Sequence, residues 1–141
     1  MTLSQVLPSK FAVFLTYCIL FLAWLPPEGN IVLVVGFGWI TSSIVVIRLL
    51  RRWLEPIDFQ LRGWVLLWGG GGLAVGAVVP WIILALMALK TGVHAHGPEY
   101  TPAEINWVAQ QWPFWLSLGG GIGLGYGLLT AGWLGMRAKA Q

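Results

Sequence analysis

The sequence predicts an all-α integral membrane protein, with four transmembrane helices in two hairpins that form one domain over residues 1–141. Three observations predict this class. Hydrophobic residues make up 57% of the chain and charged residues only 9%, whereas soluble domains carry about 25% charged residues. The apolar residues fall into four long runs, separated by segments that hold proline, glycine or charge. Lysine and arginine gather in alternate connecting segments, as membrane insertion favours.

The first predicted span covers residues 11–27 and stops at Pro26 and Pro27, because consecutive prolines cannot continue a helix. Its length of about 17 residues is at the low end of the range for a spanning helix. No small-residue cleavage site follows it, so we expect an uncleaved helix rather than a signal peptide.

The second predicted span covers residues 31–50, with Asn30 placed to cap its first amides. The third covers residues 64–89, which is long enough to cross a bilayer with tilt. Pro80 lies in the middle of this run and removes one helical hydrogen bond, so we expect a bend there.

The fourth predicted span covers residues 113–136 and follows a short helix at the membrane interface. The segment Thr101-Pro102-Ala103-Glu104 predicts the start of that short helix. It combines a capping box with proline at the first helical position.

The distribution of positive charge predicts the orientation. With four spans, seven of the eight basic residues fall on one side, and only Lys90 falls on the other. The positive-inside rule then places both termini on the cytoplasmic or stromal side of a bacterial inner membrane or an organellar or thylakoid membrane. No basic face with interleaved aromatic residues is present, so we expect no nucleic-acid partner.

Small residues recur at four-residue spacing in the last two apolar runs. Such stripes let helix backbones approach closely in a bilayer, where the main chain has no other hydrogen-bond partner. The residues predicted to pack helix against helix are Gly72, Gly76, Gly119, Gly123, Gly127, Ala131 and Gly135. The further glycines Gly121, Gly125 and Gly132 widen the stripe, so another face of the last helix is available to a neighbouring chain.

Ionisable and catalytic side chains are scarce in the predicted spans. None of the four runs contains Asp, Glu, Lys or His at bilayer depth, which argues against a proton-coupled pump and an intramembrane enzyme. The hydroxyls that could line a pore are Thr41, Ser42, Ser43, Ser117 and Thr130. Their alternative role is hydrogen bonding between helices.

Two further features bear on ligands. His94 and His96 could contribute to a metal or haem site, but a metal site needs three or four ligands, so we expect no metal. Trp39, Trp68 and Trp81 lie deep in their runs, either as filler opposite the glycines or as a flat wall for a lipid, quinone or pigment ring. No particular cofactor is indicated.

The sequence therefore favours a non-enzymatic accessory, assembly or stabilising subunit of a larger membrane complex. Its expected partners are membrane lipid and other membrane protein subunits, or further copies of the same chain. One alternative is a small oligomeric channel or transporter lined by the hydroxyls. A weaker alternative is a haem or pigment binding protein that uses the two histidines.

Overall fold

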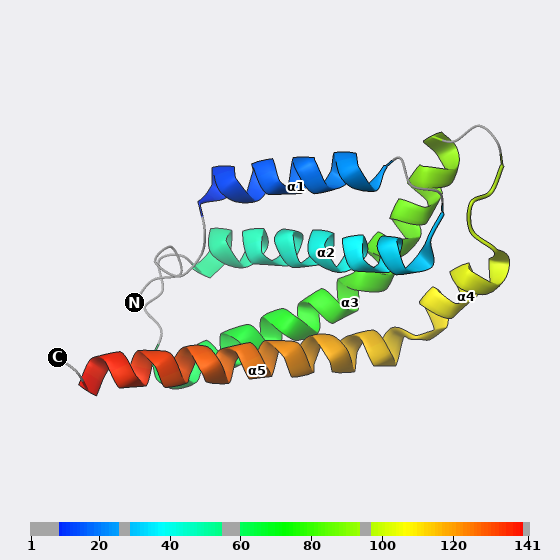
Figure 1. Ribbon diagram of the computed structural model, residues 1–141. Helices are drawn as coiled ribbons and strands as arrows, with labels where there is room; N and C mark the ends of the chain where they lie inside the picture. Colours follow the sequence, from blue (N-terminus) through cyan, green and yellow to red (C-terminus); the bar gives the residue numbers. More distant parts are fainter. Residues whose placement is uncertain (1–8, 26–28, 55–59, 94–96, 140–141) are drawn as a thin grey trace.

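The computed structural model describes residues 9–25, 29–54, 60–93 and 97–139. Over these residues the chain forms α-helices and no strand, as predicted (Figure 1). The helices are α1 (Lys10–Trp24), α2 (Ile31–Leu54), α3 (Leu61–Val93), α4 (Pro102–Gln110) and α5 (Trp112–Lys139). By length and composition, α2, α3 and α5 are each apolar enough to cross a membrane.

The first helix is shorter than the span that the sequence predicts. Ser9 caps α1 by accepting a hydrogen bond from the Ala12 amide at 3.2 Å, and the helix ends at Trp24 after 15 residues. At 1.5 Å per residue, that is about 22 Å of helix, against roughly 30 Å of bilayer hydrocarbon. Residues 26 and 27 of the predicted span lie outside the described residues.

The other helices extend beyond their predicted spans. Asn30 caps α2, because its Oδ1 accepts a hydrogen bond from the Val32 amide at 2.9 Å, and the helix runs on to Leu54. α3 has 33 residues and continues through Pro80; its axis changes direction past the middle (Figure 1). Hydropathy marks only the apolar part of a helix, whereas backbone hydrogen bonding carries the helix on into its charged ends.

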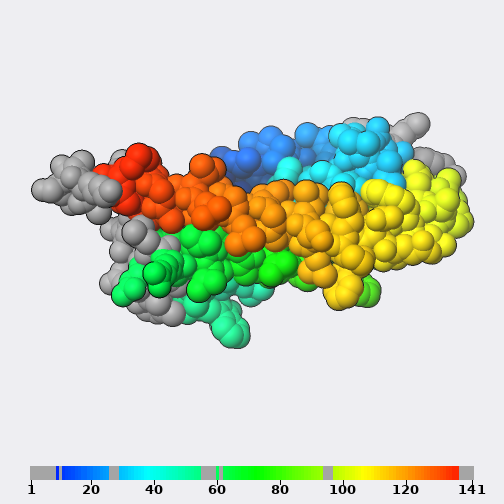
Figure 2. Space-filling view, turned by 90° about the horizontal axis from the view of Figure 1, so that it is seen from below, coloured from blue at the N-terminus to red at the C-terminus, as the bar shows by residue number. Residues whose placement is uncertain are grey.

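The long helices form a row rather than a closed bundle. α1 lies antiparallel to α2, α2 crosses α3, and α5 lies along the first half of α3 (Figure 1). The α3–α5 contact is the most extensive in the molecule and the α1–α2 contact is slight. The row is elongated, with the beginning of α1 and the end of α5 at the same end of the molecule (Figures 1 and 2).

Aromatic rings hold α1 against α2. Trp24 stacks on Phe37 with ring centroids 5.0 Å apart, and Tyr17 stacks on the same ring at 5.5 Å. The Tyr17 hydroxyl also lies 3.3 Å from the Thr41 hydroxyl. Such offset and stacked pairs contribute about 0.5–1.5 kcal/mol each beyond their buried area, which compensates for the small contact area of this helix pair.

The short helix before α5 is present as predicted. Thr101 Oγ1 accepts a hydrogen bond from the Glu104 amide at 3.3 Å, and Glu104 Oε2 accepts one from the Thr101 amide at 2.8 Å. These bonds favour the carboxylate, so they lower the pKa of Glu104. α4 is fixed to α5 by Trp115, whose Nε1 donates to the Val108 carbonyl at 3.2 Å.

Candidate functional site

The contact between α3 and α5 is made backbone to backbone at glycines. A Cβ atom added to Gly72 would meet the Gly119 carbonyl oxygen and would lie 2.8 Å from the Gly123 Cα. A Cβ atom on Gly119 would lie 2.8 Å from the Gly76 amide nitrogen. Real Cβ atoms essentially never approach other heavy atoms this closely, so no larger residue fits without moving a helix.

The close contact extends one turn in each direction and then stops. Gly76 lies against the backbone of Trp115, and a Cβ atom on Gly127 would lie 2.9 Å from the Val65 Cα. Beyond this point Ala131 is half-buried, and a Cβ atom on Gly135 would meet nothing within 4 Å. Of the predicted stripe on α5, the structure therefore places Gly119, Gly123 and Gly127 in the tight interface.

A second set of glycines on α5 points away from α3. Cβ atoms added to Gly121, Gly125 and Gly132 would meet nothing within 4 Å among the described residues. Gly121 and Gly125 are exposed and lie one helical turn apart, so they leave a strip of bare backbone on the outer face of the helix.

The five candidate pore hydroxyls lie in different surroundings. Thr41, Ser117 and Thr130 each donate to the carbonyl four residues earlier in their own helix, at 2.8–2.9 Å. Ser42 is fully buried, whereas Ser43 lines a cavity. The single chain thus does not bring the five hydroxyls to one passage.

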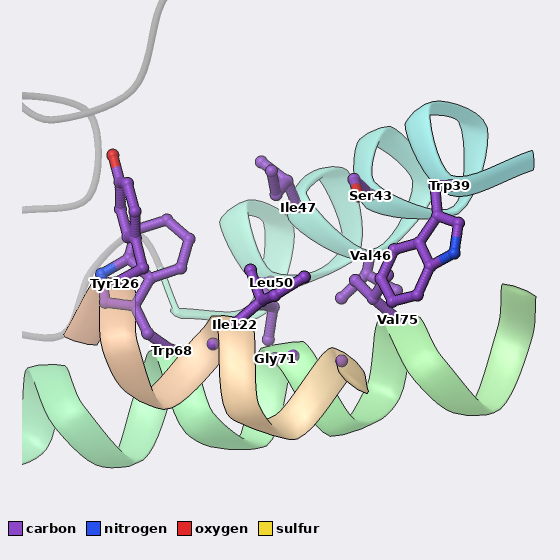
Figure 3. A pocket seen from close by; sticks show the side chains of 13 residues that line it. Trp39, Ser43, Val46, Ile47, Leu50, Trp68, Gly71, Val75, Ile122 and Tyr126 are labelled. Carbon is purple, nitrogen blue, oxygen red and sulfur yellow. The ribbon is translucent and has the colours of Figure 1, made fainter. Parts of the chain in front are cut away.

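A partly open cavity of about 280 Å³ lies between α2, α3 and α5 (Figure 3). Trp68 and Tyr126 stand at one end, with ring centroids 4.7 Å apart, and Trp39 and Ser43 stand at the other (Figure 3). Its remaining lining is apolar or bare backbone, namely Val46, Ile47, Leu50, Gly71, Gly72, Val75, Gly119, Ile122 and Gly123. The third deep tryptophan, Trp81, is 70% exposed and lies elsewhere.

A buried ion pair joins the far end of α3 to the segment before α4. Lys90 is fully buried, and its Nζ lies 3.8 Å from Glu99 Oε2, whose side chain is 4% exposed. The same ammonium lies 5.1 Å from the centre of the Trp24 ring of α1, a distance that allows a cation–π interaction. The pair therefore links three segments of the chain at this end of the molecule.

Tyr100 lies next to this pair and is 4% exposed. Burial raises the pKa of its hydroxyl to about 12, and the negative charges of Glu99 and Glu104 add to the effect. Burial and nearby carboxylates both disfavour a phenolate.

The raised pKa predicts a loss of stability in strong alkali. The neutral phenol is favoured in the fold, so its contribution is complete below pH 10.0, the unfolded value, and is lost as the pH rises through about 12. We expect the stability difference between wild type and Tyr100→Phe to shift against wild type over this interval. Absorbance of tyrosinate measures the ionisation, by difference between the two proteins. A Tyr100 that ionises at its ordinary pH would contradict the prediction.

The remaining ligand candidates fall outside the described residues or form no site. His94 and His96 belong to residues 94–96, which are not described. Among the described residues, no group of three His, Cys, Asp or Glu side chains could hold a metal ion. The histidine site stays a prediction.

The described architecture defines a class of protein: a small all-helical chain in which three helices are long and apolar enough to cross a membrane. Comparison with protein families, with curated proteins and with solved structures gave no match.

Proposed function

We propose that this chain is a non-enzymatic accessory, assembly or stabilising subunit of a larger membrane complex, which it joins through the outer face of α5. One observation carries the proposal. Both sides of α5 present glycine, and α3 covers only one of them: Gly119 and Gly123 are packed, whereas Gly121 and Gly125 face open space.

The row architecture leaves this second face available. α3 is the main neighbour of α5 within the chain, and α2 contacts α5 at the Trp39–Trp115 ring pair, whose centroids are 6.2 Å apart. In Figure 2, the side of α5 away from α3 forms an uncovered surface of the described chain. A partner helix can therefore lie along α5 without displacing any described helix.

A protein partner explains the glycines better than lipid does. Glycine weakens a helix by about 1 kcal/mol relative to alanine, and a backbone left bare toward acyl chains gains nothing in return. Against a second helix, the same bare backbone allows close van der Waals contact, which drives helix association in membranes. The favoured occupant is a transmembrane helix of another subunit.

The proposal includes the number of spans and the side of the membrane on which the termini lie. α1 is a fourth span, and both termini lie on the cytoplasmic or stromal side of a bacterial inner membrane or an organellar or thylakoid membrane. The supporting observations are the shared end of the molecule for the start of α1 and the end of α5 and the one-sided distribution of basic residues.

Bulky substitutions on the outer face test the proposal. Gly121→Leu and Gly125→Leu have room for the new side chain, so the isolated chain should keep its stability. We expect at least a tenfold loss of co-purifying subunits in mild detergent, because leucine holds the partner backbone away.

Gly36→Leu on α2 is the matched control, since its Cβ also meets nothing within 4 Å, and it should retain the partners. Mass spectrometry of each purified complex measures how much of the partner subunits the three variants retain. Retention of partner chains by Gly121→Leu and Gly125→Leu, or a wild-type preparation that contains only copies of this chain, would contradict the proposal.

A further inference from the structure

We propose that the cavity between α2, α3 and α5 holds one acyl chain of an anionic phospholipid, with the phosphate beside Arg51. This cavity is a different surface from the outer face of α5. Its shape, the polar groups at one of its ends and the positive charge at the end of α2 all suit such a lipid.

The cavity is long and narrow. Trp39 and Leu50 mark its length along α2, and at 1.5 Å per residue they are about 16 Å apart. Its floor includes Gly72, Gly119 and Gly123, which lie at the tight contact between α3 and α5. A hollow of about 280 Å³ with this length suits a flexible chain of methylene groups.

The lining also suits a hydrocarbon chain. Between its aromatic ends the cavity is walled by aliphatic side chains such as Leu50 and Ile122 and by the bare backbone of Gly71 (Figure 3). A group that hydrogen-bonds would find few partners along this stretch. An acyl chain needs none, and it gains dispersion contacts with the atoms that line the cavity.

Polar groups gather at the end nearest the C-terminus of α2. Trp68 and Tyr126 stand there (Figure 3), and the buried Trp68 Nε1 has no hydrogen-bond partner among the described residues. Indole and phenol groups are typical of the level of lipid headgroups, where one edge of the ring is apolar and the other is wet. The glycerol ester oxygens of a phospholipid are acceptors of the required kind.

The same end is positively charged. Ile47 and Leu50 line the cavity, and Arg51, four residues after Ile47, continues that face of α2. The last two turns of α2 hold three arginines, at positions 48, 51 and 52, and no carboxylate. Basic side chains beside a groove between transmembrane helices attract anionic headgroups. An anionic phospholipid, whose headgroup has no cation to compensate the phosphate, therefore fits this end of the cavity better than a zwitterionic phospholipid.

Lipid add-back to the full-length protein tests the inference. Protein stripped of lipid in detergent is titrated with phosphatidylglycerol or with phosphatidylcholine of the same acyl chains, and thermal stability and native mass spectra are recorded. We expect saturable stabilisation and one retained lipid with phosphatidylglycerol, at concentrations at least fivefold lower than with phosphatidylcholine. Equal dependence on the two lipids would overturn the assignment.

Two variants locate the lipid. Ser43→Phe fills the cavity, and we expect it to lose the retained lipid, whereas Val45→Phe, at a position that is already 39% exposed on α2, should keep it. Arg51→Gln should weaken binding of phosphatidylglycerol about fivefold and should weaken binding of phosphatidylcholine less, because its own ammonium already compensates the phosphate.

A lipid with brominated acyl chains gives a second measurement, because bromine quenches nearby tryptophans. Quenching should fall in Ser43→Phe relative to wild type, since Trp39 and Trp68 line the cavity. Unchanged quenching and unchanged lipid retention in Ser43→Phe, or crosslinking of residue 43 to another polypeptide, would overturn the proposal.

Discussion

Replacing Gly123 with leucine is expected to separate α5 from α3 and to destabilise the isolated chain by at least ~3 kcal/mol, the upper end of ordinary overpacking costs. The reason is geometric. A Cβ atom at this position would meet the Trp68 carbonyl oxygen and lie 2.8 Å from the Gly72 Cα. Both obstacles are backbone atoms, so no change of rotamer can relieve the clash.

Thermal unfolding in detergent measures the effect, with Gly125→Leu as the matched control. The control lies two residues away on the same helix, and its Cβ would meet nothing within 4 Å. Leucine favours a helix more than glycine does, so the control should be at least as stable as wild type. Equal stability of Gly123→Leu and Gly125→Leu would show that the two helices do not need close backbone contact.

Replacing Lys90 with methionine is expected to destabilise the fold by ~3–5 kcal/mol, because it breaks a buried ion pair by removing one charge from beside the Glu99 carboxylate. The ammonium is fully buried, and the carboxylate side chain is only 4% exposed. Loss of the ion also removes the cation from the face of Trp24. The end of α1 and the segment before α4 should therefore loosen from α3.

Removal of both charges distinguishes a buried pair from a simple packing role. Lys90→Met combined with Glu99→Leu should recover most of the lost stability, since apolar residues of similar volume can replace a buried pair. Lys90→Arg keeps the charge and should cost less than Lys90→Met. Unfolding by heat or by a denaturing detergent provides the measurement. A double variant less stable than either single variant would contradict the role given to the pair.

The helical class follows directly from the composition. The short helix that starts at Thr101 follows from a local sequence motif. The capping box depends on residues three apart in sequence, so the pattern contains the whole interaction. The helix ends were harder to predict. α3 runs four residues beyond Leu89, to Val93, because helical hydrogen bonds do not stop where hydropathy falls.

The burial of the ion pair between Lys90 and Glu99 could not be predicted from the sequence pattern. Counting charges treats Lys90 as a loop residue, although its position directly after a long apolar run was an available signal. Its burial depends on Glu99 and Trp24, which other segments supply. The cavity is a similar case, because Trp39, Trp68 and Tyr126 come from three different helices.

By itself, the sequence determined that this protein is helical, suited to a membrane and rich in small residues on its last two apolar helices. Those properties depend on the identity and spacing of residues along one chain segment. Only the tertiary structure decided which glycines of α5 meet α3 and which face outward, because that choice depends on the rotation and crossing of two helices. The same rotation sets the cavity and leaves the outer face of α5 uncovered by the other described helices.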